Sequence, residues 1–243
     1  RLEERFGYDK AKKEERILDR AGCLAFTDAR LLLFPIKSMK GVFVWATSKR
    51  AIERLKADML LSSSSQPELA SFQVPEIKVG EALVSSEAPK VDDVVILEEY
   101  AYTATENKEL KNFAEALANI IFNAPELAFW KSLLPQYLVV LNDDEFRDFT
   151  EMSTEVITRT KIDDATGTVE EGALFTEEYL PTDSVMYSMV FASDEYGKQD
   201  QQQLKKADDV IAHFEETMQQ HITNFQLGGN ATLGKGILRI KLI

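Results

Sequence analysis

Several residue types that support common site chemistry are scarce in this sequence of 243 residues. There is one cysteine, Cys23, so no internal disulfide can form, and with two histidines the usual zinc ligand sets cannot be assembled. Cys23 lies in the apolar run GCLAF, which favours a buried structural thiol over a nucleophile. These shortages exclude a disulfide scaffold and a zinc-finger module.

Long apolar segments are also missing. No uninterrupted apolar run approaches the roughly 18 residues that a membrane helix needs, and the first residues, RLEERFGYDK, have no signal-peptide pattern. The apolar fraction of 44% and the mean hydropathy of −0.22 are typical of a globular protein with a substantial core. We therefore expect a cytoplasmic protein with no membrane partner.

Basic residues are the minority, since 28 Lys and Arg stand against 41 Asp and Glu. This balance argues at first against a nucleic-acid partner, but the basic residues are unevenly placed. Positions 30–56 hold seven basic residues and one acid, and positions 228–243 hold three basic residues and no acid. The two stretches form a basic patch if they meet in space, and two solvated faces if they do not.

The C-terminal segment LGGNATLGKGILRIKLI contains the spacing glycine, four residues, glycine, lysine. A nucleotide-binding P-loop follows a strand, opens a helix and has Ser or Thr after its lysine. Here Gly236 follows Lys235 and a strand-like run comes next, so the pattern does not favour a nucleotide hydrolase. The four glycines between 228 and 236 suit either a plain turn or a loop that lays backbone amides against phosphates.

Apolar periodicity predicts a mixture of strands and helices. We expect strands within 23–34, 42–47 and 93–97, and extended chain with a DDATG turn over 155–192. Helices are expected near 48–59, with Ser48 as its cap, near 107–122, around 143–150 as a short acidic helix, and near 203–221. The stretch SSSSQPELASFQVPEIKVG is predicted to be a loop. The loose alternation of elements favours an α+β domain with insertions over a doubly wound parallel sheet.

Three motifs, in order along the chain, carry a resemblance to a known family. They are GCLAFTDARLLLFPIKSMKGVFVWAT, TRTKIDDATGTVEEGALFTEEYLP and FQLGGNATLGKG. The sequence resembles the RAMP superfamily of CRISPR proteins, and within it the repeated backbone subunit of the type III-B (Cmr) effector complex. The resemblance implies a modified ferredoxin-like (RRM-like) RAMP fold as a single domain over 1–243, with a β-hairpin thumb at 157–180 and a glycine-rich loop and last strand at 227–243.

The same resemblance implies a function and its partners. Copies of the subunit would stack into a helical filament along guide crRNA, beside other Cmr subunits, and take part in cutting complementary target RNA with a divalent metal, Mg or Mn. Two alternatives stay open. One is a RAMP endoribonuclease that processes guide-RNA precursors without a metal, and the other is a purely structural RNA-binding subunit.

RNA-binding residues are expected in three places. The glycine-rich loop and the SMKG turn would present backbone amides, a hydroxyl and ammonium groups to phosphates, with a solvated turn as the alternative for SMKG. The thumb would separate neighbouring bases with short or apolar side chains, with an ordinary surface hairpin as the alternative. The residues are Ser38, Lys40, Gly41, Arg159, Ile162, Gly228, Gly229, Thr232, Gly234, Lys235 and Gly236.

The main catalytic residue is not expected within this sequence. The resemblance implies metal-dependent cleavage through an aspartate in a loop after the family's first strand. RLEERFG matches the region just after the family's first helix, so that strand, helix and aspartate are expected before Arg1. Asp28, in FTDAR, belongs to a different motif and is expected to help fix a strand end.

Assisting catalytic residues are expected in the motif TEEY. Glu177 and Tyr179 match a family position near the scissile phosphate, and the alternative is a pair of solvated strand positions. Metal or water positioning, or contact with the sugar, is the help they could give. His213 and His221 have no neighbouring acid pattern, so we expect ordinary helix positions for them. No metal site is evident in this chain.

Overall fold

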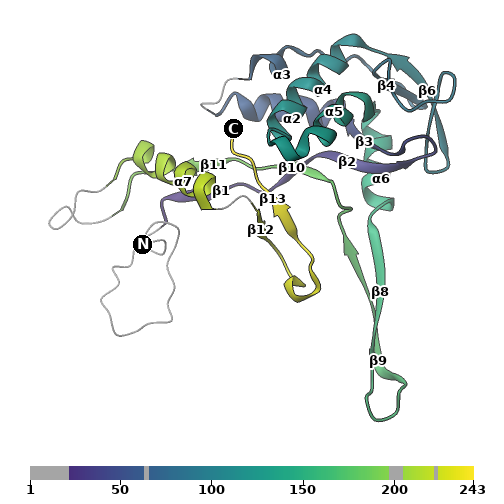
Figure 1. Ribbon diagram of the computed structural model, residues 1–243, viewed down its shortest axis with the longest axis vertical. Helices are drawn as coiled ribbons and strands as arrows, with labels where there is room; N and C mark the ends of the chain where they lie inside the picture. Colours follow the sequence, from purple (N-terminus) through teal and green to yellow (C-terminus); the bar gives the residue numbers. More distant parts are fainter. Residues whose placement is uncertain (1–21, 63–65, 197–204, 222–223) are drawn as a thin grey trace. The chain divides into compact units, whose positions relative to one another are not determined.

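The computed structural model describes residues 22–62, 66–196, 205–221 and 224–243. They form two compact units. The larger unit is Arg30–Tyr187, and the smaller unit consists of the described residues on either side of it, 22–29 and Ser188–Ile243. The larger unit holds the main sheet, and the smaller unit is built from both ends of the described chain (Figure 1).

The larger unit is centred on a seven-stranded sheet. In spatial order its strands are β10 (Val185–Tyr187), β2 (Arg30–Ser38), β3 (Val42–Ser48), β7 (Leu138–Leu141), β4 (Glu81–Val84), β6 (Tyr100–Glu106) and β5 (Val94–Leu97). Strand β3 lies parallel to β7, and β4 lies parallel to β6, while the other neighbours are antiparallel. Ser38 also pairs with Leu97, which joins β2 to β5, so all strands except β10 close into a ring.

Side chains that alternate along the strands divide the core into two clusters. On β3, Trp45 belongs to one cluster, whereas Val44 and Ala46 belong to the other. On the neighbouring strand β7, Leu138 joins Trp45 and Val139 joins Val44. None of these side chains is more than 1% exposed, as expected for strands that are covered on both faces.

Helices complete both clusters. The cluster around Trp45 takes apolar side chains from α2 (Lys49–Met59), α3 (Pro67–Ser71), α4 (Lys108–Ile121) and α5 (Ala128–Tyr137). The other cluster takes Phe146 and Phe149 from α6 (Asp143–Met152). A 3-10 turn, η1 (Pro125–Leu127), leads into α5.

The structure contains the four expected helices, as α2, α4, α6 and α7 (Ala207–His221), and adds α3 and α5. Helix α4 occupies the stretch predicted as helical near 107–122. Helix α3 lies in the stretch predicted as a loop and begins with Pro67, a residue that suits the first helical position. Helix α5 was not expected because it contains Pro135, which normally ends or kinks a helix.

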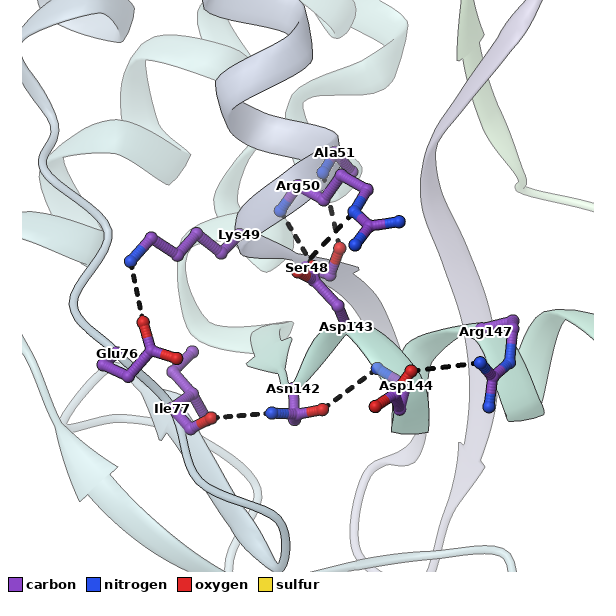
Figure 2. Close-up of polar contacts among 10 residues, drawn as sticks. All are labelled: Ser48, Lys49, Arg50, Ala51, Glu76, Ile77, Asn142, Asp143, Asp144 and Arg147. Carbon is purple, nitrogen blue, oxygen red and sulfur yellow. Dashed lines mark hydrogen bonds and ion pairs between the residues drawn. The ribbon is translucent and has the colours of Figure 1, made fainter.

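The N-termini of α2 and α6 lie together because the two helices follow the parallel strands β3 and β7 (Figure 2). Ser48 caps α2 by accepting from the Ala51 N–H, and Asn142 caps α6 in the same way. Asp143, at the start of α6, accepts from the Arg50 N–H at 2.9 Å. Its carboxylate therefore lies at the end of α2 where the helix dipole favours negative charge.

The smaller unit consists of two antiparallel strand pairs and a helix. Strand β1 (Leu24–Phe26) is antiparallel to β11 (Val190–Ala192), and α7 (Ala207–His221) packs on β11, with the Phe26 and Phe214 rings 5.8 Å apart. Strands β12 (Asn224–Gln226) and β13 (Ile237–Arg239) are joined through the 3-10 turn η2 (Ala231–Leu233). Cys23 is 3% exposed, as the apolar run around it predicted.

One expected strand region proves to be divided. The sequence 23–34 was predicted to be a strand pair or one bent strand, but β1 and β2 belong to different units and do not pair with each other. Within the described ranges, no helix combines the length and the apolar character needed to cross a membrane.

Candidate nucleic-acid interface

The segment predicted as a thumb is a long antiparallel hairpin of β8 (Glu155–Ile162) and β9 (Val169–Tyr179), which continues from α6 (Figure 1). Asp163 holds the turn, since its carboxylate accepts two backbone N–H groups at 2.7 and 3.1 Å. A register shift precedes the last pair, Ile162 with Val169. Each of these two side chains is 50% exposed, so the tip presents apolar surface to solvent.

Three side chains on one face of this hairpin contact one another. Arg159 forms an ion pair through Nε with Oε2 of Glu177, and the Tyr179 hydroxyl donates to the same oxygen at 2.6 Å. The Arg159 and Glu177 side chains are 28% and 20% exposed. Hydrogen bonding with Tyr179, and then attraction to Glu177, raises the pKa of Arg159. The sequence singled out all three residues but not their mutual contact.

The SMKG motif forms the tight turn between β2 and β3. Gly41 has a φ of +85°, and a Cβ there would lie 2.8 Å from the Tyr137 ring. Lys40 is exposed and donates through Nζ to the Lys90 carbonyl at 2.9 Å. Ser38 is 8% exposed, and within the described residues its hydroxyl has no hydrogen-bond partner. Of the two side chains of this turn that were predicted to bind RNA, Lys40 is accessible and Ser38 is not.

The glycine-rich loop between β12 and β13 closes on itself. The Leu227 N–H donates to the Gly236 carbonyl at 2.9 Å, and the Lys235 N–H donates to a loop carbonyl at 3.3 Å. The Gln226 side chain donates to two further loop carbonyls at 2.9 and 3.2 Å. Thr232 is exposed and Lys235 is half-buried. These hydrogen bonds give the loop one defined backbone path.

The loop glycines serve different purposes. Gly228, Gly234 and Gly236 have φ values of +88°, +72° and +71°. A Cβ on Gly236 would overlap the Leu227 carbonyl, whereas a Cβ on Gly228, Gly229 or Gly234 would meet no atom within 4 Å. Gly236 is thus required by the loop itself. Gly228 and Gly229 are exposed, and their carbonyls face the Gln226 side chain, which donates to the Gly228 carbonyl at 2.9 Å.

The basic stretch at 30–56 is largely neutralised within its own unit. Five of its cations form ion pairs: Arg30 with Asp58, Lys37 with Glu98, Lys49 with Glu76, Arg50 with Asp143, and Lys56 with Glu53. Figure 2 shows two of these lysine and arginine side chains with their acidic partners. Most of this stretch is therefore a surface of paired charges.

The described residues do not form a metal site. No group of three or more His, Cys, Asp and Glu side chains among them is placed to hold a metal ion. Glu177 is already engaged by a guanidinium and a phenol. His213 is half-buried within α7, and the side chain of His221 lies outside the described residues. Asp28 is exposed in the segment between β1 and β2.

Sequence comparison defines the class of protein to which this fold and these loops belong. The sequence profile of the RAMP superfamily matches residues 2–239, so the chain belongs to the RAMP superfamily. The matched range includes both units, the β8–β9 hairpin and the glycine-rich loop. The fold is accordingly a mixed α/β RAMP fold with a closed sheet.

Within that superfamily the chain is homologous to Cmr4. It is 32% identical over 232 residues to the CRISPR system Cmr endoribonuclease Cmr4 of Pyrococcus furiosus, covering 94% of this chain and 72% of that protein. It is 25% identical over 238 residues to the CRISPR system CMR subunit Cmr4 of Saccharolobus solfataricus, covering 92% and 72%.

Solved structures of Cmr4 and of a Cmr complex are also similar to this chain. The crystal structure of oligomeric Cmr4 from Pyrococcus furiosus matches 90% of this chain and 72% of that chain, with a TM-score of 0.65 and 28% identity. A chain in the cryo-EM structure of the type III-B Cmr-beta complex bound to cognate target RNA matches 94% of this chain and 73% of that chain, with a TM-score of 0.66. At 22% identity, this second match shows a shared fold.

Proposed function

We propose that the chain is a backbone subunit of a type III-B CRISPR effector complex, which binds guide crRNA, assembles into a helical filament and takes part in cleaving complementary target RNA. The 32% identity to Pyrococcus furiosus Cmr4 over 94% of the chain supports this proposal. The match to the RAMP superfamily, over residues 2–239, includes the hairpin and the glycine-rich loop.

The proposed partners are guide crRNA, target RNA, further copies of this chain and the other Cmr subunits. An oligomeric crystal structure of Cmr4 and a target-bound structure of the Cmr-beta complex support them by analogy. We place the complex in the cytoplasm because that is where a CRISPR effector meets invading RNA. The fold is proposed to be a modified ferredoxin-like fold, with residues 1–243 forming one RAMP domain.

Guide contacts are assigned to two backbone loops. The exposed ammonium of Lys40 and the positive-φ turn at Gly41 form one contact to phosphates. In the glycine-rich loop, Gly228 and Gly229 offer open backbone and Lys235 adds charge, while Gly234 and Gly236 fix the path beside Thr232. Ser38 stays a prediction, and its buried hydroxyl could reach RNA only if the turn opened.

Target contacts are assigned to the β8–β9 hairpin. The half-exposed apolar tip at Ile162 suits a wedge that separates neighbouring bases without reading their sequence. Splayed nucleotides leave the RNA backbone open to in-line attack. Arg159, Glu177 and Tyr179, which lie along the same hairpin, are the residues proposed to assist at the phosphate.

We also propose that cleavage by the complete complex uses a divalent metal such as Mg or Mn. A divalent ion would stabilise negative charge at the reacting phosphate. The described residues do not fit a metal site by themselves, so no metal ligand is assigned among them.

Cleavage products and their metal dependence distinguish this function from its alternatives. A target-cutting subunit loses cleavage in a chelator, whereas a guide-precursor nuclease that works by general acid–base chemistry keeps it. A purely structural subunit binds guide RNA and supports no cut at its own position in any condition.

A salt titration of guide binding tests the proposal at the glycine-rich loop. Lys235→Ala should weaken binding to unrelated guide sequences equally, because a phosphate contact carries no sequence information. It should also reduce the slope of log affinity against log salt by about 0.7, the value for one single-strand contact. Lys206→Ala is the matched control, since Lys206 is an exposed lysine of the same unit that lies outside the loop and pairs with Asp194. Equal effects of the two variants would contradict the assignment.

A further inference from the structure

We propose that Arg159 is the thumb side chain that contacts a target-RNA phosphate at the cleavage position, and that Glu177 and Tyr179 are positioning residues that hold its guanidinium. The inference rests on the proposed function, and it gives Glu177 a role different from that of a metal or water ligand.

The register of the hairpin brings these residues together. Arg159 lies opposite Phe175, so Glu177 is its diagonal neighbour on the same face, and Tyr179 follows two positions further on β9. Diagonal neighbours on an antiparallel pair are within reach of long side chains. The other glutamate of the TEEY motif, Glu178, points to the opposite face, where its Oε1 accepts from the Thr154 hydroxyl at 2.5 Å. Glu177 and Glu178 therefore lie on opposite faces of the hairpin and contact different residues.

The pairing geometry leaves part of the guanidinium available. A guanidinium carries five N–H donors in a planar fork, and the ion pair with Glu177 is made through Nε. A guanidinium paired through Nε still has N–H donors on its two terminal nitrogens, and this planar fork suits bidentate contact with a phosphate. Nε of Arg159 is buried, so the 28% of the side chain that is exposed lies on its other atoms.

The Glu177 carboxylate is poorly suited to bind a metal in this arrangement. Its Oε2 forms an ion pair with the Arg159 guanidinium and accepts a hydrogen bond from the Tyr179 hydroxyl. A cation that approached this oxygen would compete with the positive charge of Arg159 and with the phenolic proton. A role in holding the guanidinium is consistent with both contacts, whereas a role as a metal ligand through Oε2 would require both to be broken.

The chemistry required of Arg159 is electrostatic. In-line cleavage forms a bond between the 2′ oxygen and phosphorus while the bond from phosphorus to the 5′ oxygen breaks. The 2′ hydroxyl loses its proton to solvent and the 5′ oxygen gains one. Arg159 neither takes nor gives a proton in this step. It stabilises the negative charge that develops on the non-bridging phosphate oxygens.

Cleavage of target RNA by the assembled complex is the first test. Arg159→Ala should slow cleavage at this subunit's position by about 10²–10³-fold, the usual effect of removing one preorganised donor. Arg159→Lys should resemble Arg159→Ala, because a lysine ammonium lacks the planar fork that binds a phosphate through two parallel hydrogen bonds while Nε is paired with Glu177. Glu177→Gln, which keeps an acceptor oxygen for Arg159, should lose less activity than Glu177→Ala.

A double variant separates positioning from independent action. If Glu177 acts through Arg159, the combination of Arg159→Ala and Glu177→Ala should cut about as slowly as Arg159→Ala alone. The metal concentration for half-maximal cleavage should be unchanged in Glu177→Gln. Two results would overturn the inference. One is a double variant whose loss of cleavage rate equals the product of the two single losses, and the other is a higher metal requirement in Glu177→Gln.

Target binding gives a readout that does not depend on cleavage. Arg159→Ala should lower the salt slope of target binding to guide-loaded complex by about one phosphate contact, and leave guide binding unchanged. Lys161→Ala is the matched control, because Lys161 lies two residues further along the same strand and, like Arg159, has an acidic partner, Glu170. Normal target binding and cleavage in Arg159→Ala would refute the role of Arg159. Absence of guide binding by the wild type would instead refute the proposed function, and size-exclusion chromatography of each variant shows whether assembly is intact.

Discussion

Gly41, in the turn between β2 and β3, lies directly against the ring of Tyr137 at the end of α5. A Cβ at position 41 would come within 2.8 Å of the ring and 2.9 Å of Pro89. The turn that we propose to contact RNA therefore packs against the end of α5, the helix that precedes β7. This packing is possible because residue 41 has no side chain.

Gly41→Ala should destabilise the protein by about 2–4 kcal/mol, because it combines a left-handed backbone with a steric overlap. Gly80→Ala is the matched control: its φ of +80° is similar to the +85° of Gly41, but no atom lies within 4 Å of the added Cβ. It should cost about 1–2 kcal/mol. Urea denaturation of both variants measures the difference. Equal losses would show that Tyr137 gives way without strain.

Asp58 in α2 joins three elements through its carboxylate. It pairs with Arg30 of β2 and accepts from the Tyr187 hydroxyl of β10 at 2.7 Å. Burial alone would raise the pKa of Asp58, but hydrogen bonds from Arg30 and Tyr187 outweigh it and lower the pKa below 3.8. Because the folded pKa is depressed, this stabilisation is present above about pH 4 and is lost as the pH falls through the folded value.

Asp58→Asn should reduce the free energy of unfolding by about 1–3 kcal/mol near neutral pH, since it removes charge-assisted hydrogen bonds. The difference from wild type should stay constant above about pH 5 and shrink below pH 4. Chemical denaturation at several pH values measures it. Asp93→Asn serves as control, because Asp93 is 89% exposed and its weak pair should contribute less than about 1 kcal/mol. A difference that grows in acid would contradict the assignment.

Gly236→Ala and Gly234→Ala should have unequal effects on guide binding. Both positions have φ near +72°, at +71° and +72°, so backbone strain is matched. At Gly236, however, the added Cβ would overlap the Leu227 carbonyl and break the bond that closes the loop. We expect Gly236→Ala to weaken guide binding more than Lys235→Ala does. Gly234→Ala should weaken guide binding less than Gly236→Ala. Fluorescence anisotropy with labelled guide RNA measures the order.

Shortening 162–169 to a two-residue turn should leave guide binding nearly intact and abolish the regular spacing of distorted nucleotides on the target strand. The hairpin tip holds the half-exposed Ile162 and Val169, and these side chains would be lost with it. Chemical probing of the target in the assembled complex reports the distortion. Ala165→Ser keeps the length of the tip and is the control. If the target strand keeps its periodic chemical reactivity in the shortened variant, the hairpin tip does not separate the bases.

Local signals in the sequence were sufficient for several elements. The apolar face of α4, the Ser48 cap of α2 and the turn residues around Asp163 each act over a few positions, and the structure contains all three. The glycine-rich loop could be located for the same reason, because glycine spacing is a short-range pattern. Family resemblance, rather than periodicity, supplied the proposed roles of these elements.

Contacts between segments that are far apart in the sequence could not be predicted from such local patterns. The ion pair of Arg159 with Glu177 depends on the hairpin register, which includes a shift that no local pattern indicates. The acidic partners of the basic stretch, such as Asp143 for Arg50, come from remote helices and loops. The closure of the sheet through Ser38 likewise requires two strands far apart in sequence. Each of these is a tertiary pairing that propensity does not encode.

The pairing of β1 with β11 has a consequence for the order of folding. The whole unit Arg30–Tyr187 lies between these two short strands in the sequence. During synthesis the larger unit can close its sheet as soon as its own residues emerge, whereas β1 must wait for β11. Joining chain segments so far apart is slow because the intervening loop must first be confined. A folded Arg30–Tyr187 unit makes this pairing faster. Its first and last strands, β2 and β10, are neighbours, so residues 30 and 187 are already close together when β1 and β11 pair.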